Sequence, residues 1–128
     1  MSKKRITQGQ IAPVRAALLA KQDHKCPLCH GSMKGGKKKP ALDHCHTTGA
    51  IRDVLCLNCN GMEGKIFNLA RRGLKDDPML FLQRFLEYHE KHRVDQHRLI
   101  HPTHKTEAQK RAARNLKARK KRAAAKKA

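Results

Sequence analysis

Hydrophobic residues in this sequence occur in short groups separated by polar stretches. Val14 and Leu18 lie at helical spacing just after Pro13, a residue that suits a first helical turn, so a leading helix is expected to end near Asp23. The segment before it, residues 1–10, carries three basic side chains and little apolar content, which is typical of a basic arm. We expect the helix to pack on the domain that follows it.

Two short extended segments and a second helix are expected next. Residues 40–46 and 51–55 have the length of paired strands, and Gly49 lies in the turn between them. Apolar residues at three-to-four spacing from about Asn60 then predict a helix with Gly73 as its C-cap. The order of strand, strand and helix indicates an α+β fold.

Beyond this region the pattern predicts a helical extension and a basic tail. Asp77 followed by Pro78 marks a helix start, and the broad apolar face that follows must pack on another helix or on a second copy of the chain. We assign 74–104 to this extension, which could form a homodimer. Residues 105–128 contain eleven basic residues and one acid with almost no bulky apolar side chains, so the tail is expected to be disordered alone and partly helical on a polyanion.

Composition indicates the class of partner. The 128 residues include 30 Lys and Arg against 10 Asp and Glu, and a formal net charge of +20 repels itself unless a polyanion neutralises it. Aromatic residues make up 3% and mean hydropathy is -0.79, so the apolar core must be small. We find no apolar run long enough for a membrane span or a signal peptide. Nucleic acid is the expected partner and a reducing cytosol the expected compartment.

Four of the five cysteines form two C-x-x-C pairs, Cys26 with Cys29 and Cys56 with Cys59. Four thiolates at this spacing can converge on a tetrahedral structural zinc, which supplies folding energy that a small core lacks. The 26 residues between the pairs exceed the gap of a plain zinc ribbon, so an extra element lies between them. Two disulfides or a redox motif are the alternatives, and both lack the secretory or thioredoxin-like pattern they need. We predict a zinc-bound domain over 11–73.

A second polar group lies within and just after this insert: Asp43, His44, His46, Asn60 and Glu63. Carboxylate and amide oxygens suit one Mg²⁺, and a neighbouring neutral histidine can deprotonate water. Strand alternation predicts that Asp43 faces away from both histidines. Simpler explanations exist for two members, because Asn60 could be a helix N-cap and Glu63 an ordinary first-turn acid.

These residues together resemble the phage recombination endonuclease VII family of HNH nucleases. The motifs that carry the resemblance are Asp43-His44-x-His46 and Cys59-Asn60-x-x-Glu63, with the cysteine pairs, over residues 24–73. The resemblance implies a small zinc-stapled ββα-metal (His-Me finger) core with flanking helices. It implies a structural zinc on the four cysteines, His44 as general base, and Asp43 and Asn60 as ligands of a catalytic Mg²⁺ that Mn²⁺ could replace. His46 and Glu63 would support them.

Three functions follow from these observations. The first is an Mg²⁺-dependent DNA endonuclease, and the resemblance implies a dimer that resolves Holliday junctions and other branched DNA in the cytoplasm of a phage-infected bacterium. The second is a nicking or general HNH nuclease on linear duplex DNA, and the third is a non-catalytic zinc-finger DNA-binding protein. The cations expected to contact phosphates are Arg52, Lys65, Arg71 and Arg72.

Overall fold

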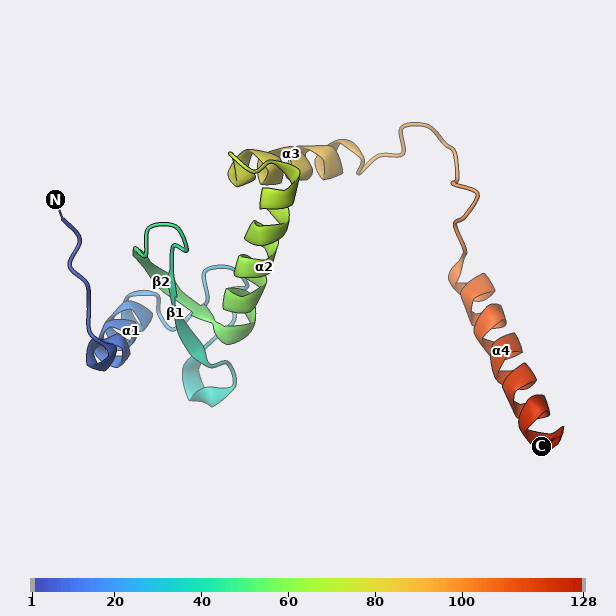
Figure 1. Cartoon of the computed structure of the whole chain (residues 1–128), viewed down its shortest axis with the longest axis horizontal. Helices are drawn as coiled ribbons and strands as arrows, with labels where there is room; N and C mark the ends of the chain where they lie inside the picture. Colours follow the sequence, from blue (N-terminus) through green and yellow to red (C-terminus); the bar gives the residue numbers. More distant parts are fainter. Residues whose placement is uncertain (1, 128) are drawn as a thin grey trace. The chain divides into compact units, whose positions relative to one another are not determined.

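The computed structural model describes residues 2–127 and divides into two units, Met1–Tyr88 and His89–Ala128 (Figure 1). In chain order the elements are the 3-10 helix η1 (Gln8–Gln10), α1 (Ile11–Lys21), the 3-10 helix η2 (Lys34–Gly36), β1 (Pro40–His44), β2 (Ile51–Cys56), α2 (Leu57–Gly73), α3 (Pro78–Lys91) and α4 (Glu107–Lys127). Helices and one small sheet together confirm a mixed helix and strand architecture. No helix within residues 2–127 combines the length and apolar character that crossing a bilayer requires.

The leading helix, α1, packs on the β1–β2 hairpin, which lies between α1 and α2 (Figure 1). Leu18 and Leu19 contact the core. Just beyond the helix, the side-chain amide of Gln22 donates to the Val54 carbonyl at 2.8 Å and accepts from the Val54 N–H at 2.7 Å. The Gln22 side chain therefore satisfies the backbone N–H and carbonyl of Val54 in β2, as a neighbouring strand would.

β1 and β2 form the antiparallel two-stranded sheet that the sequence predicted. Their register shifts by one residue just before His44, which pairs with Ile51. Asp43 therefore lies opposite two residues of β2, Arg52 and Asp53, which is a β-bulge. Regular strand alternation is interrupted at this point, because a bulge bends its strand and redirects the side chains on it.

The core of the first unit is small and contains three cysteines. Its buried members are Cys26, Met33, Val54, Leu55, Cys56 and Cys59. Val54 is the largest fully buried side chain, and burial of apolar area contributes only about 25 cal/mol per Å². A core of this size needs a further source of stability, as the low aromatic content predicted.

The ends of α2 differ from the sequence prediction. The helix begins directly after Cys56, about three residues early, because the Cys56 sulfur caps it by accepting from the Cys59 N–H at 3.5 Å. At the other end Leu74 is the C-cap, so the predicted role of Gly73 as C-cap is wrong. A Cβ at Gly73 would overlap the ring of Phe81, and the glycine therefore allows α3 to pack closely on the end of α2.

The third long helix starts where the acid and proline predicted. Pro78 is the first residue of α3, and the Asp77 carboxylate accepts from the Leu80 N–H at 3.0 Å as an N-cap. Several of its large apolar residues are exposed within the first unit: Met79, Phe81, Phe85, Leu86 and Tyr88.

In the second unit, the tail expected to be disordered is the helix α4. Thr106 and Gln109 form a capping box, in which the Thr106 N–H donates to the Gln109 side chain at 2.8 Å and the Gln109 N–H donates to the Thr106 hydroxyl at 3.2 Å. Lys110 pairs with Glu107 at 2.9 Å. The segment has no core, but the helix propensity of Ala, Lys and Arg together with this cap favours a helix.

Candidate metal centre and active site

The four paired cysteines converge as their spacing predicted. Their sulfur atoms all lie within 4.8 Å of one another, and those of Cys29 and Cys56 are 4.0 Å apart. A tetrahedral zinc with bonds of about 2.3 Å requires sulfurs roughly 3.8 Å apart. The cluster can therefore hold a metal ion, and Cys45, the fifth cysteine, lies outside it.

Hydrogen bonds to the sulfurs give the cluster unequal thiols. The Gly31 N–H donates to the Cys29 sulfur at 3.4 Å and the Lys38 ammonium donates at 3.3 Å, and they lower the pKa of Cys29 to about 6. The pKa of Cys59 is raised to about 12, because it hydrogen-bonds to the Cys56 sulfur and is removed from water. Metal binding needs thiolates, so it must release protons from this cluster.

A second cluster centres on the guanidinium of Arg52. Its Nε lies 2.6 Å from Asp43 Oδ2, and its Nη2 donates to Asp43 Oδ1 at 3.0 Å. The same Nη2 lies 3.1 Å from Glu63 Oε2, so one side chain joins the hairpin to α2. Asp43 is only 6% exposed, and a buried carboxylate requires such a partner. The hydrogen bond and charge of Asp43 raise the pKa of Arg52, which therefore stays charged.

Two histidines complete this cluster. His44 ends β1 and is exposed, and its ring centroid lies 5.3 Å from that of His46 with the planes tilted by 54°. His46 Nε2 lies 4.0 Å from Glu63 Oε2. A Cβ at Gly64 would lie 3.7 Å from the same nitrogen, so His46 lies directly against α2. Four of the five predicted site residues are thus linked through Arg52 and these contacts.

The fifth predicted residue, Asn60, lies half-buried one helical turn before Glu63. The N-cap of α2 is Cys56, so helix capping does not explain Asn60. Glu63 is the seventh residue of the helix, and the first-turn explanation fails for it as well. Within residues 2–127, the Asn60 side chain makes no hydrogen bond, which leaves its amide oxygen available to a ligand.

The Arg52 cluster includes oxygen donors of the type that a hard divalent cation prefers. Glu63 Oε2 is buried, and although Arg52 lies at ion-pair distance, this oxygen has no hydrogen-bond partner among the described residues. Carboxylate oxygens, such as those of Asp43 and Glu63, and the amide oxygen of Asn60 are of the ligand type that Mg²⁺ prefers. The exposed His44 beside them can accept a proton.

Three other predicted cations lie on α2. Lys65, Arg71 and Arg72 are exposed, and they form no ion pair within the described part of the chain. Arg52 differs from them because two carboxylates of the protein already engage it. Phosphate contacts by the α2 cations remain a prediction.

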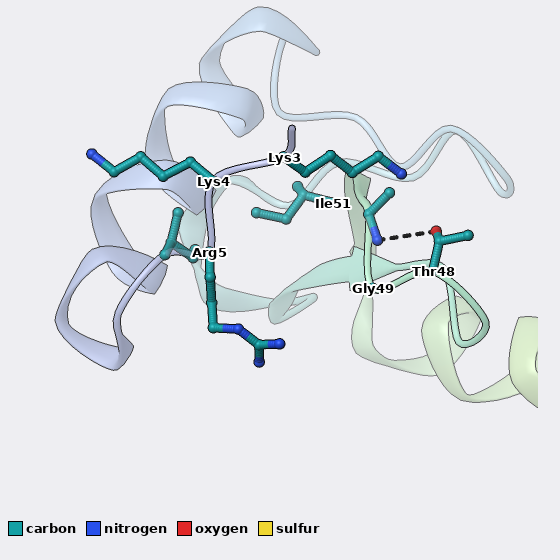
Figure 2. A pocket seen from close by; sticks show the side chains of 8 residues that line it. Lys3, Lys4, Arg5, Thr48, Gly49 and Ile51 are labelled. Carbon is teal, nitrogen blue, oxygen red and sulfur yellow. Dashed lines mark hydrogen bonds between the residues drawn. The ribbon is translucent and has the colours of Figure 1, made fainter. Parts of the chain in front are cut away.

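The basic arm lies beside the hairpin turn and encloses a cavity of about 540 Å³ with it (Figure 2). Lys3, Lys4 and Arg5 line one side, and residues 48–51 line the other. Figure 2 shows the Lys3 side chain extending over the turn and the Lys4 side chain extending in the opposite direction. Three basic residues and no acidic residue line this cavity.

One family of known proteins matches the first unit of the chain. The family model of recombination endonuclease VII matches residues 2–91, a span that includes the arm, both cysteine pairs and the whole Arg52 cluster. No curated protein sequence matches the chain significantly. The match confirms the resemblance carried by the motifs and extends it beyond residues 24–73.

Proposed function

The chain belongs to the recombination endonuclease VII family, and on that basis we propose that it is an Mg²⁺-dependent DNA endonuclease that resolves Holliday junctions and other branched DNA. The supporting observation is that Asp43, His44, His46 and Glu63 gather around one arginine, which lies at ion-pair distance from a buried Glu63 oxygen that has no hydrogen-bond partner among the described residues. A binding-only zinc finger does not require this arrangement of acids and histidines.

In the proposed mechanism His44 is the general base. Its exposed imidazole takes a proton from the water that attacks the scissile phosphate. Asp43, Asn60 and Glu63 would hold Mg²⁺, which would supply Lewis-acid stabilisation of the charge that develops on the phosphate and the leaving oxygen. His46 lies beside Glu63 and would contact the phosphate. The bond between phosphorus and the 3′ oxygen breaks and that oxygen takes a proton from solvent, which leaves 5′-phosphate and 3′-hydroxyl ends.

We assign the remaining parts as follows. Zinc is the metal of the cysteine cluster, since four thiolates at near-tetrahedral spacing are its preferred set, and residues 11–73 form a ββα-metal core from β1, β2 and α2. The extension 74–104 carries the dimer contact on the exposed apolar face of α3. The arm 1–10, the α2 cations and the tail 105–128 bind DNA phosphates.

Cleavage of an end-labelled four-way junction beside a linear duplex of matching sequence tests this function. We expect paired cuts across the junction with Mg²⁺ and none with EDTA. His44→Ala should abolish cutting while DNA binding and zinc content stay unchanged. His104→Ala, which removes a histidine outside the cluster, is the matched control and should cut normally.

Two other results would replace the proposal. Equal cutting of junction and duplex would favour a nicking or general HNH nuclease with the same catalytic group. Tight DNA binding without divalent-dependent cutting would overturn the enzyme in favour of a zinc-finger DNA-binding protein.

A further inference from the structure

The Arg52 cluster places a positive charge between two carboxylates that are proposed metal ligands. Asp43 and Glu63 contribute two negative charges, and Arg52 places one positive charge between them at 2.6 to 3.1 Å. Both oxygens of Asp43 are engaged by this one guanidinium. The net charge that faces an arriving cation is therefore one negative charge instead of two.

This positive charge is permanent but its position is adjustable. A guanidinium does not lose its proton at any working pH. Its side chain is 39% exposed, whereas that of Asp43 is 8% exposed, so the arginine head can be reached from solvent while the carboxylate is fixed. Arginine also matches phosphate geometry in a bidentate fashion. A DNA phosphate at the cluster would therefore compete with the two carboxylates for Arg52.

We propose that Arg52 makes metal loading of this site depend on DNA. In the free protein the guanidinium engages Asp43 and Glu63 and weakens the binding of a divalent cation. A backbone phosphate that enters the cluster draws Arg52 away and adds the negative charge that balances the cation. The inference rests on the proposed nuclease function, and it makes Arg52 a positioning residue for the metal ligands.

The coupling must work in both directions, because linkage is reciprocal. If DNA strengthens metal binding by a given factor, the metal strengthens DNA binding by the same factor. A divalent cation and a fixed unit charge a few ångströms apart interact strongly even at an effective dielectric constant near 20, so we expect a factor of at least about ten.

Mn²⁺ binding, followed by the electron paramagnetic resonance signal of the free ion, tests the proposal. All proteins are the zinc-loaded full chain carrying His44→Ala, so that DNA is not cut, and the signal with DNA alone is subtracted. For this parent we expect Mn²⁺ affinity to rise at least about tenfold when a four-way junction is added. Asp43→Asn should abolish the tight site and thereby identify it.

Substitution of the arginine separates its charge from its shape. Arg52→Gln should raise Mn²⁺ affinity without DNA by about tenfold and reduce the effect of DNA by a similar factor. Arg52→Lys keeps the charge and should stay close to the parent. Arg84→Gln removes an exposed arginine of α3 and is the matched control, with no expected change.

Several results would overturn the proposal. Unchanged or weaker Mn²⁺ binding by Arg52→Gln without DNA would mean that Arg52 only supports the fold. If Arg52→Gln loses zinc, the test rests on the parent protein with His44→Ala. Equal Mn²⁺ affinity of that parent with and without the junction rejects the coupling. Failure of the nuclease function is seen separately, as an absence of Mg²⁺-dependent cutting by the wild-type protein.

Discussion

Around the cysteine cluster the chain is buried and held by contacts between distant residues, whereas every residue of α4 is exposed and its described contacts are local. The hairpin is tied to α1 through Gln22 and to α2 through Arg52, which spans residues far apart in the sequence. The helix α4 depends on a capping box and on high helix propensity. The two regions should therefore respond to different perturbations.

The two regions also suggest two different modes of DNA binding. In the first unit the cation at the proposed site, Arg52, is held by ion pairs with two carboxylates. In α4 the cations surround an exposed helix with no acid beyond Glu107. The first arrangement can select a phosphate geometry, while the second supplies affinity for any polyanion.

Loss of metal binding should have the largest effect and should affect the first unit alone. Cys56→Ser removes both a metal ligand and the cap of α2, and structural zinc contributes apparent binding energies of about 10–16 kcal/mol, so we expect the first unit to unfold. Zinc content and the dispersion of amide NMR signals measure this. Cys45→Ser, outside the cluster, should keep its zinc and its fold. A folded, zinc-free Cys56→Ser protein would contradict the dependence on metal.

Deletion of residues 105–128 should affect DNA affinity and leave the first unit intact. The tail carries eleven basic residues, and we expect junction affinity at low salt to fall at least about tenfold with a shallower salt dependence. Fluorescence anisotropy over a salt series measures both quantities. Replacing the α4 lysines by glutamine is the matched control for helix formation and should reproduce the loss. A thermal midpoint that falls with the deletion would show that the tail supports the fold.

Gln22→Ala should destabilise the first unit by about 1–3 kcal/mol, because it leaves the donor and acceptor of Val54 unpaired. Urea unfolding of the zinc-loaded protein measures the change. Gln83→Ala removes an exposed side chain whose amide contacts only Glu87 among the described residues, and it should change stability by less than about 0.5 kcal/mol. Equal changes in stability for the two substitutions would show that the Gln22 hydrogen bonds to Val54 do not stabilise the first unit.

The smallest expected effect concerns Lys38 and depends on pH. The hydrogen bond from the Gly31 N–H stabilises the Cys29 thiolate most, and the hydrogen bond from Lys38 adds to it. The Cys29 pKa of about 6 should therefore rise in Lys38→Ala. A thiol with a lowered pKa stabilises the fold above its ordinary value of 9.0 and loses that contribution as pH falls through about 6. Zinc affinity of the variant should therefore be a few-fold weaker near pH 6 and unchanged near pH 9.

Competition with a coloured chelator across this pH range measures the effect. Lys37→Ala removes the neighbouring charge without the contact to sulfur, and its pH profile should match that of the wild type. A uniform loss of affinity at all pH values would indicate a structural effect of Lys38 instead.

Local signals in the sequence predicted much of this structure. The cysteine spacing predicted a metal cluster, Asp77 before Pro78 predicted the start of α3, and Gly49 marked the hairpin turn, where its φ is 72°. Asp43, His44 and His46 are adjacent in the chain, so one hairpin end necessarily brings them together.

The features that the sequence did not predict depend on register and on long-range contacts. The bulge that sets Arg52 against Asp43 comes from a shift of one residue in strand pairing, which no single residue type specifies. Gln22 reads as an ordinary helix-end residue until β2 lies beside it. Gly73 is of the residue type typical of a C-cap, whereas in the structure it makes room for the Phe81 ring. In each case the role of the residue depends on a contact with another helix or strand.

Cys56 has a consequence for how this chain can change in length. The residue ends a strand, belongs to the cysteine cluster and caps α2, so a metal bound by that cluster would fix the rotation of the helix. One residue inserted between Cys59 and Asn60 would turn Asn60 and Glu63 by about 100° away from Asp43. Extra residues within η2, which is not part of α2, would leave that angle unchanged. The spacing between the cysteine cluster and the proposed catalytic groups therefore depends on the number of helical residues between them. We expect insertions to be tolerated in η2 and not at this junction.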